Sequence, residues 1–193
     1  MEVSETSDVD SGVRVSGTGL TLRPWRPGDE GALVRALNDP DVERFMNAIP
    51  VPYSTADAMA WVCELAPAAW AAGGAEFALD LGDGLAIGSL GVRREDRGDG
   101  VVGVVGYWVT PLARGRGLAS QALCLAAPWA AAHLGLDRQE LVHDLANVAS
   151  CRTAIAAGFQ ADSVVTGGAR YRDGTPRDIE RHTWTADRAR SRS

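Results

Sequence analysis

The sequence predicts one α/β (α+β) domain with a mixed, mainly antiparallel sheet of about seven strands flanked by helices. Three observations support this fold class. Helical periodicity dominates the first third, three consecutive extended segments joined by short turns favour hairpins, and an apolar strand then leads through a Gly-containing turn into a long Ala/Leu-rich helix. A length of 193 residues suits one domain with tails.

The first third predicts a strand followed by three helices. Residues 20–25 alternate apolar and polar side chains as a strand does, and residues 27–37 then follow a helical apolar period. A short helix is expected over residues 41–46. A third helix begins with a capping hydroxyl at residue 54 or 55 and runs toward residue 72, with an interruption at Pro67.

The middle of the chain changes to an extended period. Residues 76–81, 85–93 and 101–109 are separated by Gly-containing and polar turns, which is typical of successive hairpins. The third segment is apolar on both faces and is therefore expected at the centre of the sheet. The long helix after it runs to Leu134.

The last third predicts a strand, a helix and a final pair of strands. The strand covers residues 140–144, and the helix covers residues 148–157 and is closed by Gly158. The final two strands flank a turn at residues 173–174, where an Asp-Gly pair favours reversal of the chain.

Both ends of the chain have the composition of solvated tails. Residues 1–17 are acidic and Ser-rich, and residues 186–193 alternate Arg with small or polar residues. We therefore expect a disordered tail over residues 1–17, one domain over residues 18–185 and an Arg-rich tail over residues 186–193. No apolar run reaches the ~20 residues of a membrane span, and no signal-peptide pattern opens the chain, so neither export nor a membrane is expected.

Charge and composition exclude several mechanisms. All 19 basic residues are Arg, so neither a Schiff-base lysine nor a P-loop lysine exists. The formal net charge of −6 disfavours a nucleic-acid partner, because nonspecific affinity for a phosphate backbone comes from basic patches. The same charge slightly favours a cationic partner.

The chain has three cysteines and three histidines: Cys63, Cys124, Cys151, His133, His143 and His182. The cysteines form an odd set without a CxxC pair, which is typical of reduced core residues in a cytoplasmic protein. The histidines have no ligand spacing along the chain, so no metal is expected.

The segment over residues 107–120 carries the strongest chemical signal. It joins the apolar strand to the long helix, so unpaired N–H groups at the helix start point at one spot with the positive end of the helix dipole behind them. Gly115 and Gly117 allow a ligand to approach the backbone, and Arg114 and Arg116 offer charged donors. This pattern predicts a phosphate site. Neither a GxGxxG dinucleotide motif nor a P-loop fits it.

The pattern Arg114-x-x-Gly117-x-Ala119 resembles the pyrophosphate loop of the GNAT superfamily of acyl-CoA-dependent N-acetyltransferases. A second element that begins at Asn147 and ends in Gly158-Phe159 is similar to a family helix that begins with Asn and closes in Gly-Phe. The order of expected elements matches the family over nearly the whole chain.

Three features resemble the Rim-type branch of this superfamily, whose named members acetylate the N-termini of ribosomal proteins. They are the opening Leu-Thr-Leu-Arg-Pro-Trp of residues 20–25, the Arg-Gly-Arg-Gly form of the loop, and Asn147-x-x-Ser150. The resemblance implies a GNAT-like sheet that splays in the middle, between residues 101–109 and 140–144, and acetyl-CoA as cosubstrate. It implies an amine acceptor, either a protein N-terminus or a small molecule, and a homodimer as a possible assembly.

The resemblance also implies contacts with the cofactor. The residues implied to bind the CoA pyrophosphate are Arg114, Gly115, Arg116, Gly117, Leu118, Ala119 and Ser120. The amide near Val109 is implied to hold the thioester carbonyl, and Asn147 to contact the pantetheine arm.

Many members of the family place a Tyr seven residues after the Asn as the acid that protonates the departing thiolate. This chain has Ala154 there. Ser150 lies one helical turn from Asn147, at the spacing of the Rim-type branch, and is the candidate acid.

No residue stands out as the base that deprotonates the amine. His143 is the candidate because its intrinsic pKa suits the task. Glu43 and Asp144 are alternatives that act through water, and no base is needed if the amine arrives neutral. The amine is expected to enter between residues 44–53 and the hairpin near residues 171–174.

Simpler interpretations stay open for the same residues. The Arg-Gly-Arg-Gly stretch is compatible with a solvated turn or an RNA-binding element, and Asn147 with an N-cap. The missing Tyr favours a noncatalytic acyl-CoA-binding module as the alternative function. An RNA-binding protein is the third possibility, and the net charge argues against it.

Overall fold

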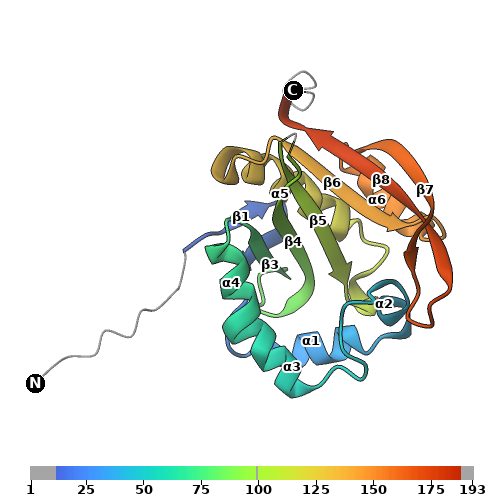
Figure 1. Cartoon of the computed structure of the whole chain (residues 1–193). Helices are drawn as coiled ribbons and strands as arrows, with labels where there is room; N and C mark the ends of the chain where they lie inside the picture. The colour runs from blue at the N-terminus through green and yellow to red at the C-terminus, as the bar shows by residue number, and fades with distance from the viewer. Residues whose placement is uncertain (1–11, 99, 188–193) are drawn as a thin grey trace, which may run out of the picture.

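An eight-stranded sheet runs through the computed structural model, which describes residues 12–98 and 100–187 (Figure 1). The strands lie in the order β1-β2-β3-β4-β5-β6-β8-β7, and neighbours are antiparallel except the parallel pair β5 and β6. Their bounds are β1 (Val15–Gly17), β2 (Leu20–Pro24), β3 (Ala75–Asp80), β4 (Ala86–Asp96), β5 (Val101–Val109), β6 (Arg138–Asp144), β7 (Gln160–Arg170) and β8 (Pro176–Thr185). The predicted fold class is confirmed, with one more strand than expected.

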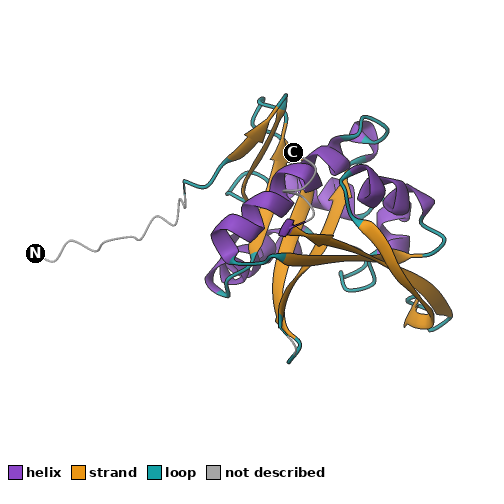
Figure 2. Cartoon of the chain, turned by 90° about the horizontal axis from the view of Figure 1, so that it is seen from above, coloured by secondary structure: helices purple, strands orange, loops and turns teal. Residues whose placement is uncertain are grey.

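Helices cover both faces of the sheet (Figure 2). They are α1 (Glu30–Leu37), α2 (Pro40–Phe45), α3 (Thr55–Ala60), the π-helical η1 (Trp61–Leu65), α4 (Ala66–Ala71), the 3-10 turn η2 (Pro111–Ala113), α5 (Leu118–Leu134) and α6 (Val148–Ala156). A buried cluster around Trp25 and Trp108 joins α1–α4 to the sheet. A second cluster, which includes Phe77 and Phe159, joins α5 and α6 to it.

Local capping explains where the early helices begin. Asp39 precedes α2, and its carboxylate accepts the N–H of Val42, which satisfies one free donor of the first turn. Ser54 and Asp57 form a reciprocal capping box at the start of α3. Pro67 lies in the first turn of α4, directly after the π-helical stretch η1, so the expected interruption takes the form of a change in winding.

The sheet opens between β5 and β6. These strands pair only over three positions, Gly103 to Val105 against Gln139 to Leu141. Beyond them β5 continues to Val109 along β4, while β6 continues to Asp144 along β8 (Figure 1). The predicted splay in the middle of the sheet is therefore present, and it leaves strand edges unpaired on both sides.

A buried ion network holds β2 to β3 and to the start of α1. The side chain of Arg23 is 2% exposed, and its guanidinium donates to Asp29 at 2.7 and 2.9 Å and to Asp80 at 2.8 Å. Burial raises the pKa of Asp80, but the hydrogen bonds from Arg23 and from nearby backbone amides outweigh burial and leave the pKa below its usual value.

The structure differs from expectation at the edges of the domain. Strand β1 lies within the predicted tail of residues 1–17 and pairs with β2, and Ala186, the first residue of the predicted C-terminal tail, packs into the core. Residues 1–11 and 188–193 of these predicted tails lie outside the described residues. Within the described ranges, no helix is both long and apolar enough to cross a bilayer.

The cysteines do not sit in the core as predicted. Cys63 and Cys124 are exposed and Cys151 is half-buried, and all three are free thiols. The positions follow from helix geometry, because a residue in an apolar-looking stretch can still fall on the outward stripe of its helix.

Candidate active site

The predicted phosphate site is a turn that ends at the first residue of α5. Gly115 and Gly117 have φ of 73° and 72°, a left-handed conformation that an L side chain adopts only with strain. No atom lies within 4 Å of where a Cβ of Gly115 would sit, so the backbone faces open space. This turn is what lets the chain pass from the end of β5 into α5 with its amides exposed.

The N-terminus of α5 presents free donors at this turn. Gly117 caps the helix and has no side chain to accept from the first turn, and in the described part of the chain the N–H groups of Leu118, Ala119 and Ser120 have no acceptor. The Ser120 hydroxyl donates to the carbonyl of Gly117 at 2.8 Å, which stiffens the turn. Free amides at the positive end of a 17-residue helix form a site for an anion.

The two arginines of the loop behave differently. Arg114 donates to Asp39 at 2.5 Å and to Asp41 at 2.9 Å, so its guanidinium is bound to the start of α2, while Arg116 is exposed. Burial raises the pKa of Asp39, yet hydrogen bonds from Arg114 and from the backbone of Val42 leave the pKa below its usual value. Arg114 thus ties the loop to α2, a contact that spacing along the chain did not indicate.

The end of β5 offers an amide to the splay. The N–H of Thr110 donates to the carbonyl of Ile87 in β4 at 2.9 Å. Because successive residues of a strand direct their N–H groups to opposite sides, the N–H of Val109 faces away from β4 and into the splay. Val109 therefore has the orientation that the predicted contact with a carbonyl requires.

Helix α6 places Asn147 and Ser150 on the other side of the opening. Asn147 caps the helix and accepts the N–H of Ser150 at 3.1 Å. The Ser150 side chain is buried, and its hydroxyl lies 2.9 Å from the phenolic oxygen of Tyr107. The structure thus brings a serine of α6 against a tyrosine of β5, across the splay.

Tyr107 is the residue that sequence analysis missed. Burial raises the pKa of its phenol, and hydrogen bonds with Ser150 and Thr153 only partly offset this, so the phenol keeps its proton near neutral pH. Ala154, at the position of the family tyrosine, is completely buried. A signal was present, because the two-residue alternation of β5 puts Tyr107 on the same face as Val105, the face that α5 and α6 cover.

His143 lies in another group of side chains. Its Nδ1 is 2.8 Å from the carbonyl oxygen of Asp144, and its Nε2 is 3.4 Å from the carboxylate of Glu180. Its ring stacks on that of His182 with centroids 5.1 Å apart. His143 contacts neither Ser150 nor Tyr107 through any hydrogen bond among the described residues.

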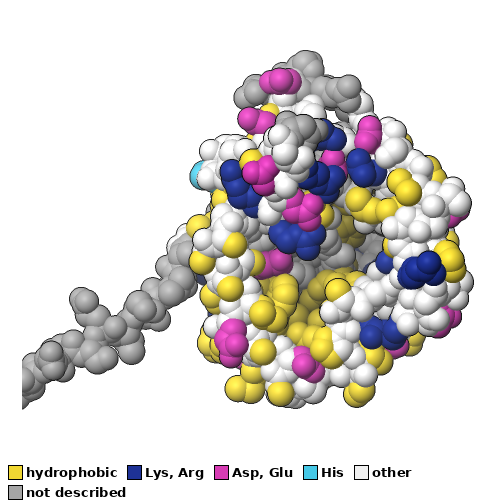
Figure 3. All heavy atoms as spheres, viewed as in Figure 1, with side chains coloured by type: hydrophobic (Ala, Val, Ile, Leu, Met, Phe, Trp, Pro, Cys, Tyr) yellow, Lys and Arg dark blue, Asp and Glu magenta, His cyan; other side chains and the backbone are white. Residues whose placement is uncertain are grey.

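A pocket of about 480 Å³ opens between α2 and the turn of the β7–β8 hairpin. Its lining comes from these two segments: Pro40, Glu43, Arg44, Asn47, Tyr171, Arg172 and Asp173. Figure 3 shows a hollow in the middle of the face seen in Figure 1, with hydrophobic side chains inside it and basic side chains around it. The pocket lies where the sequence predicted the amine to enter.

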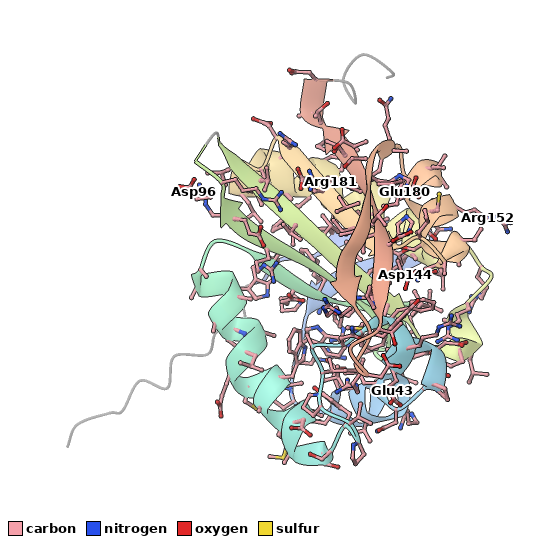
Figure 4. All side chains as sticks on the ribbon, turned by 45° about the vertical axis from the view of Figure 1, so that its right-hand side comes forward. Glu43, Asp96, Asp144, Arg152, Glu180 and Arg181 are labelled. Carbon is pink, nitrogen blue, oxygen red and sulfur yellow. The ribbon has the colours of Figure 1, made fainter. Side chains whose placement is uncertain are left out.

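Contacts across the pocket hold its walls together. Asn47 donates to the carbonyl of Arg170, and Arg172 donates to the carbonyl of Ile49 at 2.8 Å. Two effects raise the pKa of Tyr171: the larger is its hydrogen bond to Asp144, and the smaller is burial. Glu43 lies on α2 below the hairpin (Figure 4).

A family model described as an acetyltransferase (GNAT) domain matches residues 19–160. Comparison with curated protein sequences gives no match. Among solved structures, RimJ of Mycobacterium smegmatis in complex with CoA-disulfide is similar, with 23% identity, a TM-score of 0.75, and coverage of 88% of this chain and 83% of that chain.

Two further solved structures share the fold. The RimL ribosomal L7/L12 alpha-N-protein acetyltransferase in complex with coenzyme A has 17% identity and a TM-score of 0.80, over 91% of this chain and 99% of its own. The microcin C7 self immunity acetyltransferase MccE, in complex with acetyl-CoA and AMP, has 15% identity and a TM-score of 0.75, over 88% and 93% of the two chains.

Proposed function

Because the chain belongs to the acetyltransferase (GNAT) family, and so is an acetyl-CoA-dependent acyltransferase, we propose that it transfers acetyl to a primary amine by direct attack on the thioester. The observation that carries this proposal is the set of free amides at the start of α5, next to the opening between β5 and β6. The free amides suit the pyrophosphate of CoA, and the opening between the strands suits its extended pantetheine arm.

The pyrophosphate of CoA is bound by the loop before α5 and by the first turn of that helix. Gly115 and Gly117 bring the backbone close, and the amides of Leu118, Ala119 and Ser120 donate to phosphate oxygens. Arg116 is exposed and adds a charged donor. Arg114 contributes through its backbone, because its guanidinium is bound to α2.

The pantetheine arm lies in the splay. The N–H of Val109 donates to the thioester carbonyl and stabilises the oxyanion that forms on attack, since a fixed donor aimed at developing charge lowers the barrier. The side chain of Asn147 borders the arm from α6, where its role as N-cap fixes its position.

Ser150 is the proton donor to the departing thiolate, and Tyr107 positions it. The amine nitrogen bonds to the acetyl carbon and the carbon–sulfur bond breaks, so CoA leaves as a thiolate that takes the Ser150 proton. Tyr107, 2.9 Å away, fixes the hydroxyl, and solvent that has taken the proton released by the amine nitrogen reprotonates the serine. The proton lost by the amine balances the one gained by CoA.

Glu43 is better placed than His143 to be the base that deprotonates the amine. Glu43 lines the pocket, whereas His143 contacts Asp144, Glu180 and His182. A carboxylate at the entrance accepts the ammonium proton through water, and the amine then attacks as the neutral species.

The acceptor is a primary amine, either a protein N-terminus or a small cation, consistent with the net charge of −6. The likeness to RimL, an alpha-N-protein acetyltransferase by its printed name, favours an N-terminus and the Rim-type branch. Peptides with a free N-terminus therefore belong in the substrate panel beside small amines.

The test measures acetyl-CoA binding by calorimetry and then thiol release over that panel, with N-acetylated peptides as controls. Binding together with release on free but not blocked amines supports the proposal. Binding without release on any amine supports a noncatalytic acyl-CoA-binding module, the alternative that Ala154 favours. Absence of binding contradicts both.

A further inference from the structure

Four side chains with metal-binding atoms converge behind the splay. They are His143 of β6, Cys151 of α6, and Glu180 and His182 of β8, and their ligand atoms all lie within 4.8 Å of one another. His143 and Glu180 are directly opposite in the β6–β8 ladder, and His182 follows Glu180 on the same face of β8. In Figure 4, Glu180 lies beside α6, whereas Arg152 of that helix points outward.

Three imidazole nitrogens of this cluster lack a hydrogen-bond partner in the described part of the chain. His182 is 0% exposed, and among residues 12–98 and 100–187 neither of its ring nitrogens has a hydrogen-bond partner; the same holds for Nε2 of His143. A buried imidazole nitrogen without a partner is costly. Two such nitrogens, both turned toward one carboxylate, point to a cation that the cluster is built to hold.

The distances fit a tetrahedral ion. One oxygen of Glu180 lies 3.4 Å from Nε2 of His143 and 3.4 Å from Nε2 of His182. Two ligand atoms that each lie about 2.1 Å from a tetrahedral zinc ion are roughly 3.4 Å apart. Each imidazole nitrogen therefore already lies at the distance from the Glu180 oxygen that two zinc ligands have, and all four ligand atoms lie within 4.8 Å of one another.

The tautomer of His143 also fits. Its Nδ1 is 2.8 Å from the carbonyl oxygen of Asp144, and a carbonyl can only accept, so Nδ1 carries the hydrogen. Nε2 then presents its lone pair to the cluster. Metal-bound histidines are held in this way, with the outer nitrogen donating to an oxygen.

We propose that His143, Cys151, Glu180 and His182 bind one zinc ion. Two imidazoles, a thiolate and a carboxylate are zinc ligands, and the mixture of nitrogen and sulfur disfavours magnesium and calcium. Cys151 releases its proton to solvent on binding, so the thiolate and the carboxylate balance the two charges of the ion. This inference does not depend on the proposed function.

Four protein ligands make a closed, structural site. The ion joins β6, β8 and α6, and Cys151 is adjacent to Ser150 in the chain. Zinc therefore fixes the helix that carries the proposed proton donor. It also occupies Nε2 of His143, so His143 cannot then be the base.

The test is the zinc content of the full-length protein after equilibration with Zn²⁺ and removal of the excess. We expect one zinc ion per chain, loss of it in Cys151→Ser and His182→Gln, and retention in Cys124→Ser and His133→Gln, whose side chains lie on α5 outside the cluster. Zinc should also raise the melting temperature of the wild type and protect one of the three thiols from a thiol reagent.

Cys151→Ser guards against a folding artefact, because it changes one half-buried atom. Cobalt offers a second readout: the thiolate-to-cobalt absorption should appear in the wild type and vanish in Cys151→Ser. A folded wild type without zinc, or zinc retained in both cluster variants, overturns the proposal. CoA binding is measured separately, so failure of the zinc proposal can be told apart from failure of the proposed function.

Discussion

The pair formed by Ser150 and Tyr107 allows a sharp test of the chemistry. Ser150→Ala removes the proposed proton donor while leaving the amides of the phosphate loop in place. Loss of general acid catalysis lowers kcat roughly 10²- to 10⁴-fold, which corresponds to about 3–5 kcal/mol in the activation barrier. The dissociation constant of acetyl-CoA should stay within about twofold, since the pyrophosphate site does not involve this hydroxyl.

Tyr107→Phe keeps the donor and removes the group that positions it, so a smaller loss of about tenfold in kcat is expected. Because both residues act through one hydrogen bond of 2.9 Å, the double variant should match Ser150→Ala alone. Ser163→Ala, an exposed serine of β7, is the matched control and should leave kcat unchanged.

The assay is pre-steady-state and steady-state thiol release, with melting temperature recorded for every variant. Ser150→Ala deprives a partly buried phenol of one partner, and a stability loss of about 1–3 kcal/mol is expected from that alone. Turnover in Ser150→Ala within twofold of the wild type would refute the assignment. Additive losses in the double variant would show that the two hydroxyls act independently.

Three other predictions concern the loop, the ion network and the pocket. Gly117→Ala is strained at φ 72° and adds a Cβ in the proposed anion site, so it should weaken CoA binding about tenfold, or ~1.4 kcal/mol, as measured by calorimetry. Gly135→Ala is the control: it is equally strained, with φ 66°, but lies at the other end of α5 and should leave the affinity for CoA unchanged. Arg23→Met leaves two buried carboxylates without their cation and should cost about 3–5 kcal/mol in urea unfolding. In the wild type, the depressed pKa of Asp80 contributes stability that is complete above the ordinary pKa of 3.8 and is lost as pH falls through the lower pKa of the folded state, so unfolding should become easier only in acid. Glu43→Gln should reduce kcat/KM for the amine roughly tenfold at neutral pH, with recovery at high pH where the amine is neutral; superimposable pH profiles would remove Glu43 from the mechanism.

The elements that were predictable from sequence are those with a strong local pattern. The three extended segments around Phe77, Leu90 and Trp108 and the long helix after Gly117 were all anticipated, because periodicity and turn residues act over a few positions. The same applies to the turn between β5 and α5, since glycines between a strand and a helix are a local signal.

The features that were missed depend on residues brought together by topology. The ion pairs of Arg114 join positions more than 70 residues apart, and Tyr107 meets Ser150 only because β5 and α6 face each other across the splay. The absence of ligand spacing among the histidines predicted no metal. Alternation along β8 places His182 and Glu180 on one face, a signal that a search for spacing along the chain does not detect.

The most direct test of the account is amide hydrogen exchange at residues 115–120, measured with and without CoA. If backbone amides bind the pyrophosphate, exchange at Leu118, Ala119 and Ser120 should slow when CoA is added, while exchange at the far end of α5 near Gly135 stays the same. Binding of CoA with unchanged exchange at residues 115–120 would contradict the central claim.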